Sequence, residues 1–427
     1  MHRQRLQARW QALLICTVTL GLALAACRTQ PEPPPAAELP PEPPRFGEPG
    51  WEPDTLEAAM ARLDNREDWT PDGEHLHFPK HPGEKYLEGM VIVLDPGHGG
   101  AAAWEGYKRG PTGVREAEMN LRTAHLLRKL LEDAGVIVHL TREAETSDIA
   151  DDTMTPRGST LRLRAEMANN IERPDGTTGA DLFISIHYNA SSRETANYTS
   201  IWYHGDTDSA EVELDIARHI AFNTFRTMRT SEVGLTSPLL SDQLMYSAGF
   251  GVLKHTRVPA ILLELSFFSH PVEEQRLRDP HYNLKAAYGI YLGLVDYAYG
   301  GRPTQTTPEA TIEDTEMVIT TTLDDGMPDW WGSDRQRIVS STIQLTLDGV
   351  TIPHTFDPQT HLLTARVALP ENDAQPRRLT VHHANYHKHH NYPQRYAIEL
   401  NTDDTQTAAT VNPIGRPRYN NDLGRID

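Results

Sequence analysis

Signals for strands and helices alternate between Met90 and about Gly300, and this alternation constrains the fold more than any other feature. Short apolar runs, typical of buried strands, are separated by segments in which leucines recur at helical spacing. Strands that alternate with helices are typical of parallel sheets, because each helix returns the chain to the edge at which the strand began. We therefore expect an α/β domain over residues 88–300, built as a mostly parallel twisted sheet with helices on both faces.

The expected elements can be bounded from the sequence. The strands are apolar and rich in β-branched residues, and we place them at residues 91–94, 136–140, 181–186 and 260–265. The helices carry an apolar face, and we place them at residues 117–134, 162–170, 208–228 and 282–299. The carboxyl ends of parallel strands meet at one edge of a sheet, which is where open α/β sheets place their functional sites.

The amino terminus has the pattern of a signal peptide over residues 1–26. Three arginines precede an apolar run that ends at Ala26 and is shorter than the ~20 residues that a transmembrane helix needs. The run ends in Leu24-Ala25-Ala26-Cys27, which resembles the lipobox of bacterial lipoproteins, whose cysteine becomes the lipidated first residue. Arg28 follows rather than Asp, and this resemblance implies a periplasm-facing protein anchored in the outer membrane. An ordinary signal peptide with an incidental cysteine is the alternative.

A proline-rich segment follows Cys27. Residues 28–50 hold nine prolines with interspersed glutamates, which favours an extended polyproline spacer of about 3.1 Å per residue. We expect residues 27–50 to be a tether that lifts the next domain off a membrane. Residues 51–87 are expected to form a short helix and an irregular lead-in.

Cysteine count and charge exclude several classes of protein. The chain has two cysteines, Cys16 and Cys27, and the first lies in the predicted signal peptide. The processed protein would therefore lack an intrachain disulfide and a thiolate zinc site. The net charge of −19 disfavours nucleic acid as a partner and disfavours a basic membrane-binding patch, so we expect the lipid to be the membrane anchor.

The composition changes after Gly300, where a second domain is expected. Residues 301–315 are predicted to be a linker, residues 316–403 a small all-β sandwich, and residues 404–427 a polar tail. The Asp348-Gly349 dipeptide between alternating runs predicts a hairpin. The arrangement resembles the immunoglobulin-like modules that bacterial surface proteins append to enzymes, and a protein partner could bind through it.

Five histidines cluster within this predicted sandwich, and two interpretations of them are open. A solvated β-turn is favoured over a patch that sequesters metal. The cluster consists of His382, His383, His387, His389 and His390.

Two histidines follow predicted strands of the α/β domain. His98 lies in Asp95-Pro96-Gly97-His98-Gly99-Gly100, directly after the strand at residues 91–94. His187 ends the strand Phe183-Ile184-Ser185-Ile186-His187, and the polar Asn189 follows it. Catalytic zinc takes three nitrogen or oxygen ligands and leaves one position open, so both histidines are candidate ligands. A surface histidine in a glycine turn and a hydrogen-bonded histidine at a strand end are the alternatives.

Two glutamates complete the candidate set. Glu116 stands at the start of a predicted helix, where the helix dipole alone would also favour a carboxylate, and Glu118 is a rival ligand. Glu264 lies within the apolar strand at residues 260–265, where an unpaired carboxylate is costly. It therefore requires a metal, a catalytic role or a structural ion pair.

Together these segments resemble the zinc-dependent N-acetylmuramoyl-L-alanine amidases of the family 3 type, in the family's order over about residues 88–300. The resemblance implies that His98, Glu116 and His187 bind one Zn²⁺ and that Glu264 is the catalytic carboxylate. Arg142 and Asn189 are then candidates for contacting the substrate or for supporting the ligands. The matching segments are Leu94 to Gly100, Glu116 with Asn120-Leu121, Thr141-Arg142, Leu161 and Arg164 with Ala168-Asn169, Phe183 to His187, and Val258 to Ser269.

The implied substrate is peptidoglycan, and the implied reaction is hydrolysis of the amide between N-acetylmuramic acid and L-alanine, for wall remodelling, daughter-cell separation or recycling. Zinc would acidify water and polarise the scissile carbonyl, and Glu264 would carry the proton to the leaving amine. Two other functions use the same pattern: a non-catalytic peptidoglycan-binding lipoprotein, and a zinc peptidase that cuts within the stem peptide.

The chain departs from the family pattern directly after the first histidine. Residues 101–112 differ from the family's short loop and carry Trp104, Tyr107 and Lys108. His270 also stands where the family usually has Asn after Ser269. These differences bear on substrate contacts and cleft shape rather than on the predicted ligands.

Overall fold

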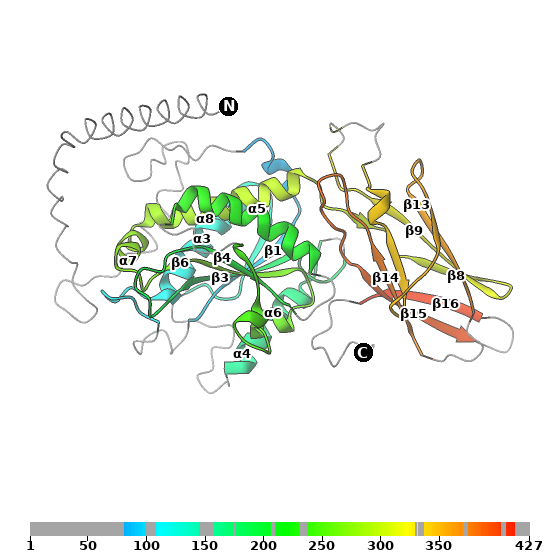
Figure 1. Cartoon of the computed structure of the whole chain (residues 1–427), viewed down its shortest axis with the longest axis horizontal. Coiled ribbons are helices and arrows are strands. Elements are labelled where there is room, and N and C mark those ends of the chain that lie inside the picture. Colours follow the sequence, from blue (N-terminus) through cyan, green and yellow to red (C-terminus); the bar gives the residue numbers. More distant parts are fainter. Residues whose placement is uncertain are drawn as a thin grey trace, which may run out of the picture. The chain divides into compact units, whose positions relative to one another are not determined.

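A mixed six-stranded sheet forms the first domain of the computed structural model (Figure 1). Its strand order is β2-β1-β3-β6-β4-β5. The first four strands in this order run parallel, β4 runs antiparallel to β6, and β5 runs parallel to β4. The structure describes residues 81–99, 108–144, 157–174, 176–205, 210–230, 237–328, 331, 337–369, 375–402 and 407–414.

The predicted strands are confirmed, and two further strands extend the sheet. The predicted runs correspond to β1 (Val91–Pro96), β2 (Ile137–Leu140), β3 (Leu182–Asn189) and β6 (Ala260–Phe267). The additional strands, β4 (Ser200–Tyr203) and β5 (Leu239–Ser241), are too short to stand out in a sequence pattern. The prediction of a mostly parallel sheet is therefore correct for β2, β1, β3 and β6, and β4 and β5 run in the opposite direction.

Helices cover both faces of the sheet, as the alternation predicts (Figure 1). One face packs against α3 (Glu116–Asp133), α5 (Glu211–Met228) and α8 (Pro280–Tyr299). The other face packs against α4 (Arg157–Asn170) and α6 (Gly251–His255). The alternation of side chains along β1 explains the two cores, because Ile92 and Leu94 enter the first core while Val91 and Val93 enter the second.

Shorter helical elements complete the description. The helix α7 (Pro271–Arg278) follows β6 directly and begins with the His270 ring accepting a hydrogen bond from the Glu273 amide. Within the described residues, 3₁₀ turns span Glu84–Leu87, Asp242–Leu244 and Ser340–Thr342. Among the described residues, no helix is long and apolar enough to cross a membrane. The predicted signal peptide, Cys27, the tether and most of the 51–87 lead-in lie outside the described residues.

The second domain consists of two antiparallel sheets. One sheet has the order β11-β10-β14-β15-β16, and the other has the order β12-β13-β9-β7 with β8 also paired to β9. Their inward residues, including Ile319, Leu345 and Leu379, form one hydrophobic core. The strands are β7 (Thr304–Gln305), β8 (Glu309–Glu313), β9 (Glu316–Asp324), β10 (Gln344–Leu347), β11 (Val350–Thr351), β12 (His354–Asp357), β13 (Leu362–Ala368), β14 (Arg377–His382), β15 (Arg395–Thr402) and β16 (Thr407–Pro413).

The predicted hairpin of the second domain is correct, but two of its predicted boundaries are wrong. Asp348 and Gly349 join β10 to β11 with φ angles of 51° and 79°, as a tight hairpin requires. The predicted linker is wrong for β7 and β8, and the predicted tail is wrong for β16. These strands present polar residues to solvent on their outer face, so their sequences have the composition of a loop.

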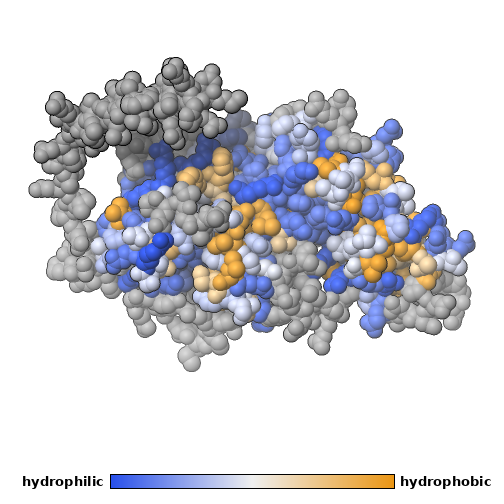
Figure 2. Space-filling model, viewed as in Figure 1, coloured by the Kyte–Doolittle hydropathy of each residue, from blue (hydrophilic) through white to orange (hydrophobic). Residues whose placement is uncertain are grey.

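The visible surface is mostly hydrophilic, with hydrophobic residues gathered in separate patches (Figure 2). Large apolar side chains that are exposed include Phe222 and Phe225 on α5 and Leu244 after β5.

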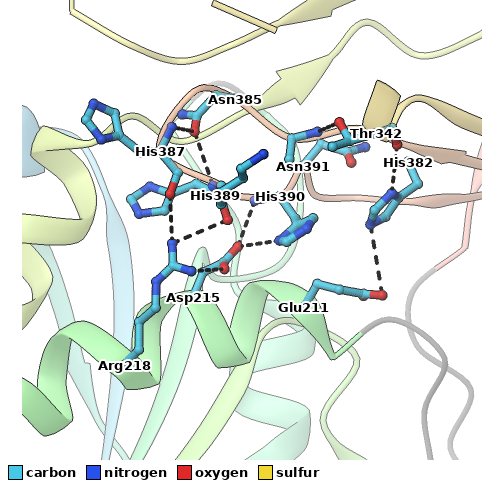
Figure 3. A network of polar contacts seen from close by, with 12 residues as sticks. Glu211, Asp215, Arg218, Thr342, His382, Asn385, His387, His389, His390 and Asn391 are labelled. Atoms are coloured by element: carbon cyan, nitrogen blue, oxygen red, sulfur yellow. Dashed lines mark hydrogen bonds and ion pairs between the residues drawn. The ribbon is translucent and has the colours of Figure 1, made fainter. Parts of the chain in front are cut away.

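The histidine cluster contacts α5, so the prediction of a solvated turn is wrong. Figure 3 shows Asp215 and Arg218 of α5 pointing toward the segment that carries the histidines. One Asp215 oxygen accepts hydrogen bonds from the backbone amide and the Nδ1 of His390, at 2.7 and 2.8 Å. The Arg218 guanidinium donates to the backbone carbonyl of His387 at 3.0 Å. The cluster is therefore part of a joint between the two domains.

The core of this joint is a pair of neutral histidines. His389 is 1% exposed, and its Nδ1 lies 2.7 Å from the carbonyl oxygen of Gly301, so this nitrogen donates. Its Nε2 must then accept a hydrogen bond from the Nε2 of His219 on α5, at 2.9 Å. Burial lowers the pKa of both His389 and His219 to about 4. A proton added to His389 would place two N–H groups against each other.

The joint should weaken in acid. A histidine titrates near 6.5 in an unfolded chain and near 4 at His389, so the unfolded state binds more protons between these values. The contribution of His389 is complete above pH 6.5 and is lost as the pH falls toward 4. In urea unfolding, the decrease in unfolding free energy between pH 7 and 4.5 should be smaller in His389→Gln by on the order of 1 kcal/mol. His361→Gln, in the turn between β12 and β13, is the control. An equal decrease in unfolding free energy in the wild type, His389→Gln and His361→Gln would contradict the prediction.

Candidate active site

Three of the predicted ligands meet at the carboxyl edge of the sheet. His98 follows β1, His187 lies near the end of β3, and Glu116 begins α3. The Glu116 Oε1 lies 2.9 Å from the Nε2 of His98 and 2.9 Å from the Nδ1 of His187. Glu116 is 1% exposed, while the two histidine side chains are 20% and 15% exposed. The cluster is therefore buried on the protein side and open on the histidine side.

The fourth predicted residue lies one strand away. Glu264 is the register partner of His187 in the parallel β3–β6 pair, so both side chains leave the same face of the sheet. Glu264 is half-buried, and its Oε2 is buried without a hydrogen-bond partner among the described residues. Its carboxyl group therefore lies on the same face of the sheet as His187, and its Oε2 has no structural partner among the described residues.

The rival ligand Glu118 lies apart from the cluster. Its carboxylate pairs with the guanidinium of Arg115 at 3.3 Å, and Glu116 alone of the two glutamates faces the histidines. Glu116 is fixed because the hairpin before it pairs Arg109 with Arg115 and joins the Glu116 amide to the Lys108 carbonyl at 3.0 Å.

The close packing of the His187 ring explains why residue 97, next to His98, is a glycine. A Cβ atom at Gly97 would lie 2.1 Å from the His187 ring, which no side chain allows. The Gly97 amide also donates to the Ile186 carbonyl at 2.9 Å, and this hydrogen bond fixes the loop to β3. His98 itself has a φ of 61°, in the left-handed region that is uncommon for a residue with a side chain.

A buried arginine stabilises the strained backbone at His98. Arg164 donates to the His98 carbonyl at 2.7 Å and pairs with Asp95 at 2.8 Å. Asp95 also accepts hydrogen bonds from the hydroxyls of Thr141 and Ser185, both at 2.6 Å. Burial alone would raise the pKa of Asp95, but Arg164 and the two hydroxyls outweigh burial, and the pKa is lowered.

Arg142 acts on the same loop from the other side. It is 3% exposed and donates to the carbonyls of Pro96, Gly97 and Ala117, at 2.9, 3.1 and 2.6 Å. The structure thus places Arg142 as a support for the loop that carries His98. Asn189 ends β3, and its side-chain oxygen accepts from the Ala190 amide at 2.8 Å.

Sequence reasoning missed Asp95 and Arg164 as the supports of the His98 loop. The sequence does contain a signal for Asp95. This residue ends an apolar strand, where an unpaired carboxylate is as costly as at Glu264. Thr141 and Ser185 reach Asp95 because β2 and β3 pair with β1, and Arg164 reaches it from α4, which packs on the face of the sheet.

Replacing Asp95 should destabilise the domain. In Asp95→Ala, Arg164 would remain buried without its ionic partner, and breaking a buried ion pair costs about 3–5 kcal/mol. Urea unfolding should show a loss of that size. Asp133→Ala, at the exposed end of α3, is the control and should change the unfolding free energy by less than about 1 kcal/mol. A similarly small loss in Asp95→Ala would contradict the support assigned to this network.

Electrostatics favour a cation in the cluster. Burial raises the pKa of Glu116, but the charges and hydrogen bonds of His98 and His187 outweigh burial and hold that pKa well below its usual range. Burial lowers the pKa of His187, but the hydrogen bond that it donates to the Glu116 carboxylate and the negative charges of Glu116 and Glu264 outweigh burial, so the net shift is upward. Burial lowers the pKa of His98, and the charge of Glu116 only partly offsets it. Glu116 is therefore an ionised carboxylate shared by two imidazoles.

The three side chains fit a divalent metal. Their ligand atoms lie within 4.8 Å of one another, a spacing that suits atoms each about 2 Å from one ion. Two imidazole nitrogens and a carboxylate oxygen are a usual ligand set for catalytic zinc. The buried Oε2 of Glu116 accepts no hydrogen bond within the part of the chain that the structure describes, so a cation would satisfy it.

Fold and site together define a class of protein. A largely parallel sheet whose carboxyl edge carries two histidines, a buried glutamate and a second carboxylate is the arrangement of a metal-dependent hydrolase. Residues 92–296 match the family model described as N-acetylmuramoyl-L-alanine amidase. Residues 92–296, just under half of the chain, are therefore an N-acetylmuramoyl-L-alanine amidase domain.

Named relatives agree with this family. The chain is 29% identical to the germination-specific N-acetylmuramoyl-L-alanine amidase of Bacillus subtilis, over 49% of this chain and 81% of the relative. It is 29% identical to the probable cell wall amidase LytH of Staphylococcus saprophyticus, over 52% of this chain and 63% of the relative. The corresponding protein of Staphylococcus aureus is 31% identical, over 49% and 59%. The chain thus spans less than two thirds of the two LytH proteins.

Solved structures of similar chains include two amidases. The CwlD amidase from Clostridioides difficile, in complex with the GerS lipoprotein, is 26% identical with a TM-score of 0.40, and the match covers 49% of this chain and 98% of that one. The catalytic domain of the amidase CwlV from Bacillus (Paenibacillus) polymyxa is 26% identical with a TM-score of 0.38, over 49% and 97%.

Proposed function

We propose that this amidase depends on zinc and that Glu264 is its general base. The reaction of the family is hydrolysis of the amide between N-acetylmuramic acid and L-alanine in peptidoglycan. The observation that carries the proposal is the meeting of His98, Glu116 and His187, with Glu264 paired to His187 on the neighbouring strand. Zinc held by these three side chains would supply a Lewis acid that polarises the scissile carbonyl and acidifies water.

Glu264 is suited to moving the proton in this reaction. Its carboxyl group accepts a proton from the attacking water and delivers it to the nitrogen of L-alanine as the amide bond breaks. Burial raises the pKa of Glu264 to about 8, with His187 opposing this shift, and a zinc ion at the cluster would favour the ionised form that takes up the proton. The products are a free lactyl carboxylate on the glycan and a stem peptide that begins with L-alanine.

A defined muropeptide tests this proposal. Protein stripped of metal with a chelator should not cleave it, and one equivalent of Zn²⁺ per chain should restore cleavage between muramic acid and L-alanine. Elemental analysis of the protein as purified should find one zinc per chain. Full cleavage by metal-free protein would contradict the proposal.

We also propose that the enzyme is a lipoprotein of the periplasm, anchored in the outer membrane through Cys27. The proposal rests on the Leu24-Ala25-Ala26-Cys27 sequence, on Arg28 and on the proline-rich segment after it. The full chain should fractionate with the outer membrane of a Gram-negative host and incorporate labelled palmitate. Cys27→Ala should lose the label, and labelling of that variant would contradict the anchor. Binding of a protein partner through the second domain stays a prediction.

A further inference from the structure

Lys108 places an ammonium group beside the candidate metal centre. Its Nζ lies 3.8 Å from the Oε2 of Glu116, and its side chain is 40% exposed. This oxygen is the one that accepts no hydrogen bond from the described residues, while the other oxygen faces both histidines. The ammonium group and a metal ion would therefore be attracted to the same buried carboxylate.

The backbone holds Lys108 in this place. Its carbonyl accepts the Glu116 amide, and its φ of 56° lies in the left-handed region. The turn that follows is anchored by Glu274 of α7, whose carboxylate accepts from the Thr112 amide at 2.8 Å and from the Val114 amide at 3.3 Å. A Cβ at Gly110 would lie 2.4 Å from the Glu274 Oε1, so the turn and the carboxylate are closely packed. The hairpin that begins at Lys108 is thus held at its base by the Glu116 amide and at its turn by Glu274.

We propose that Lys108 is an internal cation that competes with the metal for Glu116, an inference that rests on the metal centre proposed above. A buried carboxylate needs a compensating positive charge, and the ammonium group supplies part of it. Two cations at one carboxylate repel each other, so metal binding must work against Lys108. The lysine therefore weakens metal affinity and makes the metal easier to exchange.

Calorimetric titration of the full chain with Zn²⁺ tests this inference. Lys108→Met should bind Zn²⁺ about tenfold more tightly than the wild type, and Lys108→Arg, which keeps the charge, should bind like the wild type. Lys129→Met removes a lysine from α3 that pairs with Asp133, and it should leave the affinity unchanged. Circular dichroism of each variant verifies folding before titration.

The outcomes separate this inference from the proposed function. Equal or weaker Zn²⁺ binding by Lys108→Met, with tight binding by the wild type, would overturn the competition while leaving the metal centre in place. Tighter binding by Lys108→Arg as well would overturn it too, because the charge would then be irrelevant. Failure of every variant to bind Zn²⁺ would overturn the metal centre itself.

Discussion

Glu264→Gln should lower amidase turnover by about 10²–10⁴-fold while leaving zinc affinity within a few-fold of the wild type. Glutamine keeps the size and polarity of the side chain and removes its ability to take up a proton. The register of β6 against β3 places this side chain beside His187, but it is not among the three groups that meet at the cluster. The expected result is therefore a loss of turnover with an intact site.

A matched variant sharpens this prediction. Glu118→Gln changes a glutamate at the start of α3 whose carboxylate pairs with Arg115 instead of facing the histidines. It should keep turnover within a few-fold of the wild type. Turnover by Glu264→Gln at the level of Glu118→Gln would show that the general base is another group.

His187→Ala should abolish zinc binding and activity together. The imidazole supplies one of three ligands, and loss of even an outer hydrogen-bond partner of a metal ligand costs 10–100-fold in affinity, so loss of a ligand should cost at least about 100-fold. Added zinc should not restore the activity at concentrations that saturate the wild type. Titration with Zn²⁺ and a turnover assay on the same preparation measure both effects.

His139→Ala is the control for this variant, because His139 lies on β2 within the sheet and outside the cluster. It should retain both zinc binding and turnover. Retention of wild-type zinc affinity by His187→Ala would contradict the assigned ligand set.

The sequence predicts the centre of the fold well because local patterns determine it. The leucine spacing of α3 and the β-branched runs of β1, β3 and β6 identify those elements without knowledge of tertiary contacts. Parallel strands bring their carboxyl ends together, so His98 and His187 could be expected to meet.

Long-range contacts account for what the sequence did not reveal. Lys108 reaches Glu116 because Glu274 holds the intervening turn from 162 residues away, and no local pattern contains that information. The histidine cluster has the composition of a solvated turn, and only the partners on α5 make it a joint. Polar edge strands such as β16 show neither a clear alternation nor a buried run.

Hydrolysis of purified sacculi in ¹⁸O-labelled water tests the central claim most directly, with Glu264→Gln as the control. Mass spectrometry of the products should find one ¹⁸O atom on the lactyl carboxylate of muramic acid and unlabelled stem peptides that begin with L-alanine. Label within the peptide would show a zinc peptidase instead. No zinc-dependent label in either product would show a peptidoglycan-binding protein without this activity, and either result would contradict the account.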